Sequence, residues 1–221
     1  MRTGDWLVGA AMVVAAGDWV AVARHATRAG FVLKPLVIVV LMAAAVALGP
    51  GNPAVTVAGT IAALALSLAG DVFLMLPRDL FLAGLASFLL AHLAYVVAFN
   101  PTAPPIGPTL AGVVMVLAVG LPLFLRMARG MRASGRDRLV VPVALYLAAI
   151  GAMVVSAIAT VGRPDWDAPH AALAIAGAGL FFVSDSVIGW GRFVRPARHG
   201  DLVVIVTYHL GQALLVLALL G

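Results

Sequence analysis

Eight long apolar runs constrain the fold of this chain more than any other feature. A helix needs about 20 apolar residues to cross a bilayer core, and runs of that order recur, with short gaps, along all 221 residues. They fall near 6–23, 31–48, 54–76, 80–99, 106–127, 139–161, 169–190 and 201–220. Because the runs are continuous rather than alternating, they favour helices over a β-barrel. We therefore expect an all-α, polytopic membrane helix bundle with about eight transmembrane helices.

The composition excludes several other classes of protein. Only 10% of the residues are charged, against about a quarter in soluble domains, so a soluble enzyme and a disordered chain are both excluded. The formal charge of +5 is explained by membrane orientation, so no nucleic-acid partner is expected. Residues 1–221 are expected to form a single transmembrane domain, in which 1–105 and 106–221 are candidate four-helix halves related by a weak repeat.

The basic residues predict the orientation of the chain in the membrane. Twelve of the fourteen lie in or beside the loops between the first and second, third and fourth, fifth and sixth, and seventh and eighth runs. Only Arg2 and Arg163 lie on the other side. Since cytoplasmic loops carry the excess of Lys and Arg, both termini are expected to be non-cytoplasmic. We expect a multi-pass integral membrane protein of a bacterial inner (cell) membrane.

Ionisable side chains inside the predicted spans carry the functional signal. Inserting such a side chain at the centre of a transmembrane helix costs about 2.5–3.5 kcal/mol on insertion scales, so its presence indicates a structural or functional role. These side chains are Asp18, Lys34, Asp71, His92, Asp185 and His209. Their uncharged polar companions are Ser67, Tyr95, Tyr146, Ser156, Ser184, Ser186, Thr207, Tyr208 and Gln212.

Asp71 and Asp185 stand out in this set. Each lies five residues before the inner end of its span, or roughly 7–8 Å below that boundary. Two carboxylates at one depth on separate helices favour a functional role over packing. Lys34 is either a snorkelling side chain or a functional one. Asp18 is either a structural partner of Lys34 or a catalytic group.

The last two spans show where helices are expected to meet. Tyr208, His209 and Gln212 form a polar corner on one helix, because residues three or four apart share a face. Gly177 and Gly179 precede Asp185 by eight and six residues, and small residues commonly allow close helix approach in membranes. We expect a pocket that opens toward the cytoplasmic leaflet and is bounded by the second, third, fourth, seventh and eighth helices.

Several short motifs, taken in order, resemble the YhhN-type lysoplasmalogenase family of integral membrane hydrolases. The motifs are KPL at 34–36, GDVFLM at 70–75, HLAY at 92–95, SDS at 184–186 and YHLGQ at 208–212. The resemblance covers most of the chain and implies about eight helices. It also implies cleavage of the vinyl ether of lysoplasmalogen into a fatty aldehyde and a glycerophospho-headgroup. The polar positions that match are Lys34, Asp71, His92, Tyr95, Asp185, Tyr208 and Gln212.

This chemistry needs an acid that protonates the vinyl carbon and an anion that stabilises the resulting cation, a task that suits two carboxylates. The expected catalytic residues are Asp71, Asp185, His92 and Tyr208. The expected substrate-binding residues are Lys34, Tyr95, Ser184, His209 and Gln212. The substrate would be a lyso-ether phospholipid in contact with membrane lipid, and no metal or cofactor is expected.

Three other functions stay open on the residues alone. Buried Asp and His side chains also serve proton-coupled transporters. His92, His209, Asp71 and Asp185 could ligate the metal of a membrane lipid amidase, in which case a chelator would inhibit the protein. Two Asp residues also suit an intramembrane aspartyl protease, although the usual Gly-x-Gly-Asp string is missing.

Overall fold

The computed structural model describes residues 2–221, and within them the chain forms eight α-helices and no strand. The helices are α1 (Thr3–Ala23), α2 (Thr27–Leu48), α3 (Ala54–Met75), α4 (Phe81–Phe99), α5 (Ile106–Ala133), α6 (Val140–Ala159), α7 (Ala168–Phe193) and α8 (Gly200–Leu220). Short 3₁₀ turns, Asp137–Leu139 and Thr160–Gly162, flank α6. All eight helices are long and apolar enough to cross a bilayer, which confirms the predicted all-α membrane bundle.

Helix α5 differs most from its predicted bounds, because it continues six residues past the end of its apolar run at 127. The added turns carry Arg129 and Arg132. Arginine is a good helix former, and its long side chain can extend toward a membrane surface, so the loss of apolar residues does not end the helix.

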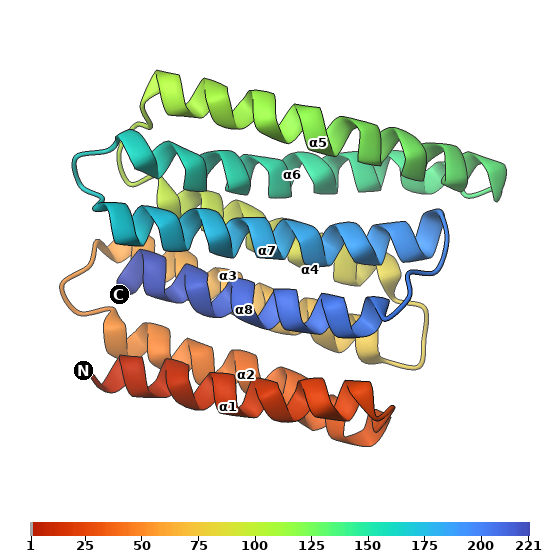
Figure 1. Ribbon diagram of the computed structural model, residues 1–221, viewed down its shortest axis with the longest axis horizontal. Helices are drawn as coiled ribbons and strands as arrows, with labels where there is room; N and C mark the ends of the chain where they lie inside the picture. Colours follow the sequence, from red (N-terminus) through yellow and green to blue (C-terminus); the bar gives the residue numbers. More distant parts are fainter. Residues whose placement is uncertain (1) are drawn as a thin grey trace.

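The helices lie side by side, with α5 at one edge of the bundle and α1 and α2 at the opposite edge (Figure 1). The helices between them pack on one another in the pairs α3 with α4, α4 with α6, α6 with α7 and α7 with α8. Helix α8 also packs on α1, α2 and α3. This arrangement brings α2, α3, α4, α6, α7 and α8 around one interior.

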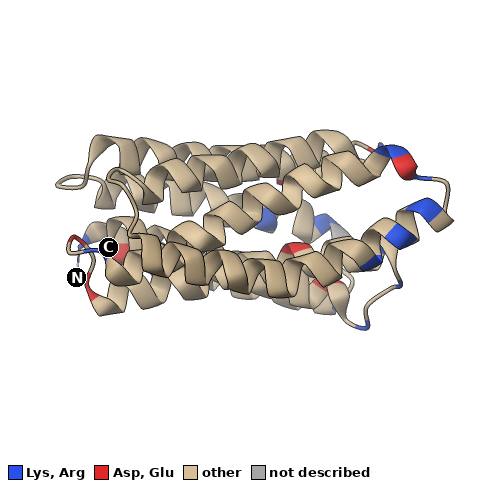
Figure 2. Cartoon of the chain, turned by 90° about the horizontal axis from the view of Figure 1, so that it is seen from above, with Lys and Arg blue, Asp and Glu red and all other residues tan. Residues whose placement is uncertain are grey.

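Both termini lie at one end of the bundle (Figure 1), and most of the Lys and Arg residues gather at the opposite end (Figure 2). Arg163, at the end that holds the termini, is buried. It donates to the Phe99 carbonyl and the Thr102 hydroxyl, both at 2.6 Å, and to Asp165 at 2.7 Å. The guanidinium lowers the pKa of Asp165 within its own loop, and its hydrogen bonds to Phe99 and Thr102 tie the α6–α7 loop to the α4–α5 connection.

We expect residues 126–138 to face the cytoplasm and the C-terminus to face away from it, because of the positive-inside rule. The chain has no cysteine, so Ser134→Cys and Gly221→Cys each introduce a single reactive thiol. In bacterial spheroplasts, a membrane-impermeant maleimide should label Gly221→Cys at once and Ser134→Cys only after permeabilisation. The unsubstituted chain is the blank, and a protected Gly221→Cys thiol would overturn the orientation.

Candidate functional site

The Asp71 cluster joins Lys34 of α2, Asp71 of α3 and Tyr208 of α8. Lys34 Nζ lies 2.7 Å from Asp71 Oδ1, and the Tyr208 hydroxyl donates to Asp71 Oδ2 at 2.7 Å. Nζ also lies 5.4 Å from the centre of the Tyr208 ring. Asp71 is fully buried. A cation and a hydroxyl donor thus enclose this carboxylate inside the bundle.

Lys34 pairs with Asp71 and not with Asp18, so the structural bridge between Asp18 and Lys34 that the sequence left open does not form. Asp18 is 1% exposed, and among residues 2–221 neither of its carboxylate oxygens has a hydrogen-bond partner. Both side chains line a cavity of about 310 Å³ between α1, α2, α3 and α8. Lys34 therefore reaches the interior rather than only snorkelling to the surface.

The Asp185 cluster joins His92 of α4, Tyr146 of α6 and Asp185 of α7. The Tyr146 hydroxyl donates to Asp185 Oδ2. His92 Nε2 lies 3.2 Å from the same oxygen and 3.1 Å from the Tyr146 hydroxyl. His92 is fully buried, whereas the Asp185 side chain is 11% exposed. Tyr146 and His92 therefore contact one side of the Asp185 carboxylate, and its other side remains accessible.

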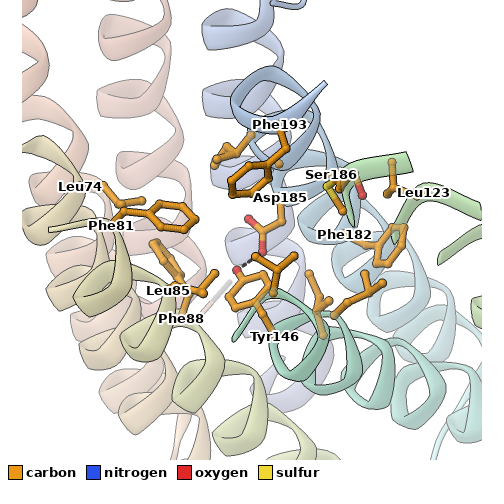
Figure 3. Close-up of a pocket in the computed structure, with 16 residues that line it drawn as sticks. Leu74, Phe81, Leu85, Phe88, Leu123, Tyr146, Phe182, Asp185, Ser186 and Phe193 are labelled. Atoms are coloured by element: carbon orange, nitrogen blue, oxygen red, sulfur yellow. Dashed lines mark hydrogen bonds between the residues drawn. The ribbon is translucent and has the colours of Figure 1, made fainter. Parts of the chain in front are cut away.

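The accessible side of Asp185 faces an apolar pocket of about 60 Å³ (Figure 3). Its walls include Leu74, Phe81, Leu85, Phe88, Leu123 and Phe182. The lining comes from α3, α4, α5, α6 and α7, whereas no described residue of α2 or α8 contributes. The predicted bounding helices were therefore right for α3, α4 and α7 but wrong for α2 and α8 at this pocket, because α6 brings Tyr146 against Asp185 and α5 closes the far wall.

Aromatic rings connect the two clusters. The Phe181 ring lies 4.8 Å from His92 and 5.3 Å from Tyr208, measured between centres. The Phe88 ring lies 6.0 Å from Tyr208. Within the part of the chain that the structure describes, Asp71 and Asp185 share no hydrogen bond. The Phe88 and Phe181 rings, 6.2 Å apart, thus link Tyr208 of the Asp71 cluster to His92 of the Asp185 cluster.

Small residues set the helix contacts that place both clusters. A Cβ at Gly70 would lie 2.6 Å from the Phe88 ring, so glycine lets α3 approach α4 beside Asp71. A Cβ at Gly177 would lie 3.0 Å from the Gly211 carbonyl, and one at Gly211 would lie 3.0 Å from the Gly177 carbonyl. Gly177 therefore mediates close approach as expected, whereas Gly179 has no neighbour within 4 Å and does not.

The remaining sequence candidates lie in the same interior but make other contacts. The Tyr95 hydroxyl donates to Gln212 Oε1 at 2.5 Å, linking α4 to α8. The Ser184 hydroxyl donates to the Val204 carbonyl at 3.1 Å, which ties α7 to α8. His209 is fully buried, and neither ring nitrogen has a partner among the described residues.

Tyr146 is the site residue that sequence reasoning missed, since it was counted only as a polar companion. A usable signal was present in the composition. The chain has three tyrosines, and all three donate to a polar side chain in this interior. In the described chain, no three His or Asp side chains gather closely enough to hold a metal ion.

Comparison with known proteins shows a consistent group of relatives. The sequence profile described as the YhhN family matches residues 29–219. Lysoplasmalogenase TMEM86B from Homo sapiens is 35% identical over 158 residues, which are 72% of this chain and 62% of that protein. The Sus scrofa protein of the same name is 33% identical over 156 residues, covering 71% of this chain and 61% of its own.

A bacterial relative extends this group. Lysoplasmalogenase from Mycobacterium tuberculosis is 35% identical over 136 residues, which are 61% of this chain and 49% of that protein. The chain therefore spans from about half to about six-tenths of the length of these relatives. No solved structure matches the chain.

Proposed function

Because the chain belongs to the YhhN family, we propose that it is a membrane-embedded hydrolase acting on lysoplasmalogen-type lyso-lipids. It would cleave the vinyl-ether bond to a fatty aldehyde and a glycerophospho-headgroup, within a bacterial inner membrane. Relatives named lysoplasmalogenase support this activity. The observation that carries the proposal is Asp185, which accepts from Tyr146 and lies beside His92 while facing an apolar pocket.

The reaction can proceed by proton transfer and addition of water. A proton is added to the vinyl carbon β to the ether oxygen, and the adjacent carbon becomes an oxocarbenium ion. Water adds to that carbon and loses a proton, and the hemiacetal then collapses to the aldehyde and the glycerol hydroxyl. General acid–base catalysis by a positioned carboxyl group typically contributes about 10²–10⁴-fold.

Asp185 is the group best placed to act as the acid. Its free side faces the pocket in which an apolar chain would lie. Among the described residues no lysine or arginine ion-pairs with it, and the ionisable side chain beside it is His92. Tyr146 and His92 orient the carboxyl group, and His92 is close enough to exchange a proton with it. After donating its proton, the carboxylate can accept one from the attacking water.

Asp71 would supply the fixed negative charge. Lys34 and Tyr208 hold it as an ion pair with an added hydrogen bond. Such preorganised charge acts most strongly in a site from which water is excluded. Lys34 also lines the 310 Å³ cavity at the basic end of the bundle, where its ammonium group can meet the phosphate of the substrate.

The saturated alkyl-ether analogue should bind but not react, because it has no double bond to protonate. Purified protein is incubated with lysoplasmalogen or with the analogue, and the products are measured by mass spectrometry. We expect aldehyde from lysoplasmalogen alone, and competitive inhibition of that release by the analogue. Equal cleavage of both lipids would contradict vinyl-ether chemistry, and ion or lipid transport without any cleavage would replace the hydrolase proposal.

A further inference from the structure

A second cavity, larger than the Asp185 pocket, lies between α4, α5 and α6. It has a volume of about 590 Å³ and is lined by α4, α5 and α6, within the range of about 300–1,000 Å³ typical of small-molecule sites. Its walls are apolar along most of their length, as at Val116, Leu117 and Val155. Its polar lining side chains are Asn100, Thr109 and Ser156, at the end of the bundle that holds the termini.

This cavity adjoins the pocket of Asp185. Leu147 lines both spaces. Gly120, on the wall of the larger cavity, lies beside this junction: a Cβ there would be 3.8 Å from Leu147 Cδ2 and 3.8 Å from Phe182 Cζ. Phe182 in turn lines the pocket of Asp185. An extended chain could therefore pass from Asp185 along the groove with Gly120 at its side.

The length of the groove suits one lipid chain. Tyr146, which contacts Asp185, and Ala159, at the far end of the cavity, are thirteen positions apart on α6. That separation is about 20 Å of helix, and one leaflet fills about 15 Å, half of the ~30 Å hydrocarbon core. The direction of the groove also agrees with a substrate whose headgroup lies at the basic end of the bundle, since the groove leads from that end toward the end that holds the termini.

We propose that this cavity, the tail channel, holds the hydrocarbon chain of the lyso-lipid substrate and selects its length. The inference rests on the proposed function, because it places the tail of the same substrate. Lipid tails are as apolar as the channel walls, so burial alone drives little binding inside a membrane. Selection for chain length must therefore come from the shape of the channel. A side chain added at Gly120 would narrow the channel where it meets the Asp185 pocket.

The kinetic test compares Gly120→Leu with Gly107→Leu, which makes the same change on the same helix where no atom lies within 4 Å of the added Cβ. Substrates with butenyl and octadecenyl chains are compared, since only the longer chain must extend past Gly120 at the channel entry. Since one misfitted methylene can change kcat/KM by about tenfold or more, Gly120→Leu should lower kcat/KM for the octadecenyl lipid by at least about tenfold relative to the butenyl lipid. Gly107→Leu should leave the ratio unchanged. An unchanged ratio in Gly120→Leu would overturn the tail channel.

A crosslinking test does not depend on turnover. A saturated alkyl-ether lysophospholipid with a terminal diazirine is irradiated with each variant, and the labelled peptides are mapped by mass spectrometry. Labels on channel residues such as Ala152 and Val155, displaced by excess unlabelled analogue and lost in Gly120→Leu, would support the channel. Two results would overturn the inference. Labels displaced equally by a diacyl phospholipid would mean that ordinary membrane lipid fills the groove. Labels found only on residues that face the surrounding lipid would mean that the tail does not enter the channel. Absence of aldehyde release by the unsubstituted protein would refute the proposed function alone.

Discussion

Asp185→Asn is expected to lower the rate of aldehyde release by about 10²–10⁴-fold. An amide has nearly the same shape as the carboxyl group and can still accept from Tyr146, so the fold should persist. It cannot give an acidic proton to the vinyl carbon or take one from water. The measurement is initial rate at saturating lysoplasmalogen, with folding followed by size-exclusion profile and thermal melting.

The matched control for this variant is Asp137→Asn, the same chemical change at an exposed residue between α5 and α6. It should keep the rate of the unsubstituted protein, because Asp137 is far from the bundle interior along both helices. Turnover near that of the unsubstituted protein in Asp185→Asn would reduce Asp185 to a packing residue and would leave the acid to be found elsewhere.

Asp71→Asn is expected to lose turnover by at least about 10²-fold and also to lower the melting temperature. Removing one partner of a buried ion pair costs about 3–5 kcal/mol. The loss should be smaller here, since the Lys34 side chain is 20% exposed and can turn toward water. Asp79→Asn is the control for stability, because it breaks an exposed pair with Arg192 that is worth about 0–1 kcal/mol.

The double variant Lys34→Met with Asp71→Asn separates stability from chemistry. With both charges removed, no uncompensated ammonium group remains inside the bundle, so the melting temperature should recover toward that of the unsubstituted protein. The rate at saturating substrate should stay low, because the negative charge is still missing. If the double variant regained turnover, the function of Asp71 would be only to neutralise Lys34.

The helices, and the position of each polar residue along them, could be predicted from sequence because the bilayer leaves few choices. Backbone groups in lipid must be bonded internally, so long apolar runs become helices. The rise of 1.5 Å per residue then places a side chain along the membrane normal. Asp71 and Asp185 could therefore be selected as interior carboxylates, and the basic loops could be assigned to one end, before any tertiary contact was known.

The neighbours of each side chain were decided only by tertiary structure, because periodicity does not reveal how a helix is rotated against its neighbours. Lys34 had two acidic residues within plausible reach and pairs with Asp71, since α2 turns it toward α3 and α8. Tyr146 is one tyrosine in an apolar run until α6 packs on α4 and α7. Contacts at single glycines, such as Gly70 against Phe88, set these rotations. They act between residues distant in sequence, so no local pattern encodes them.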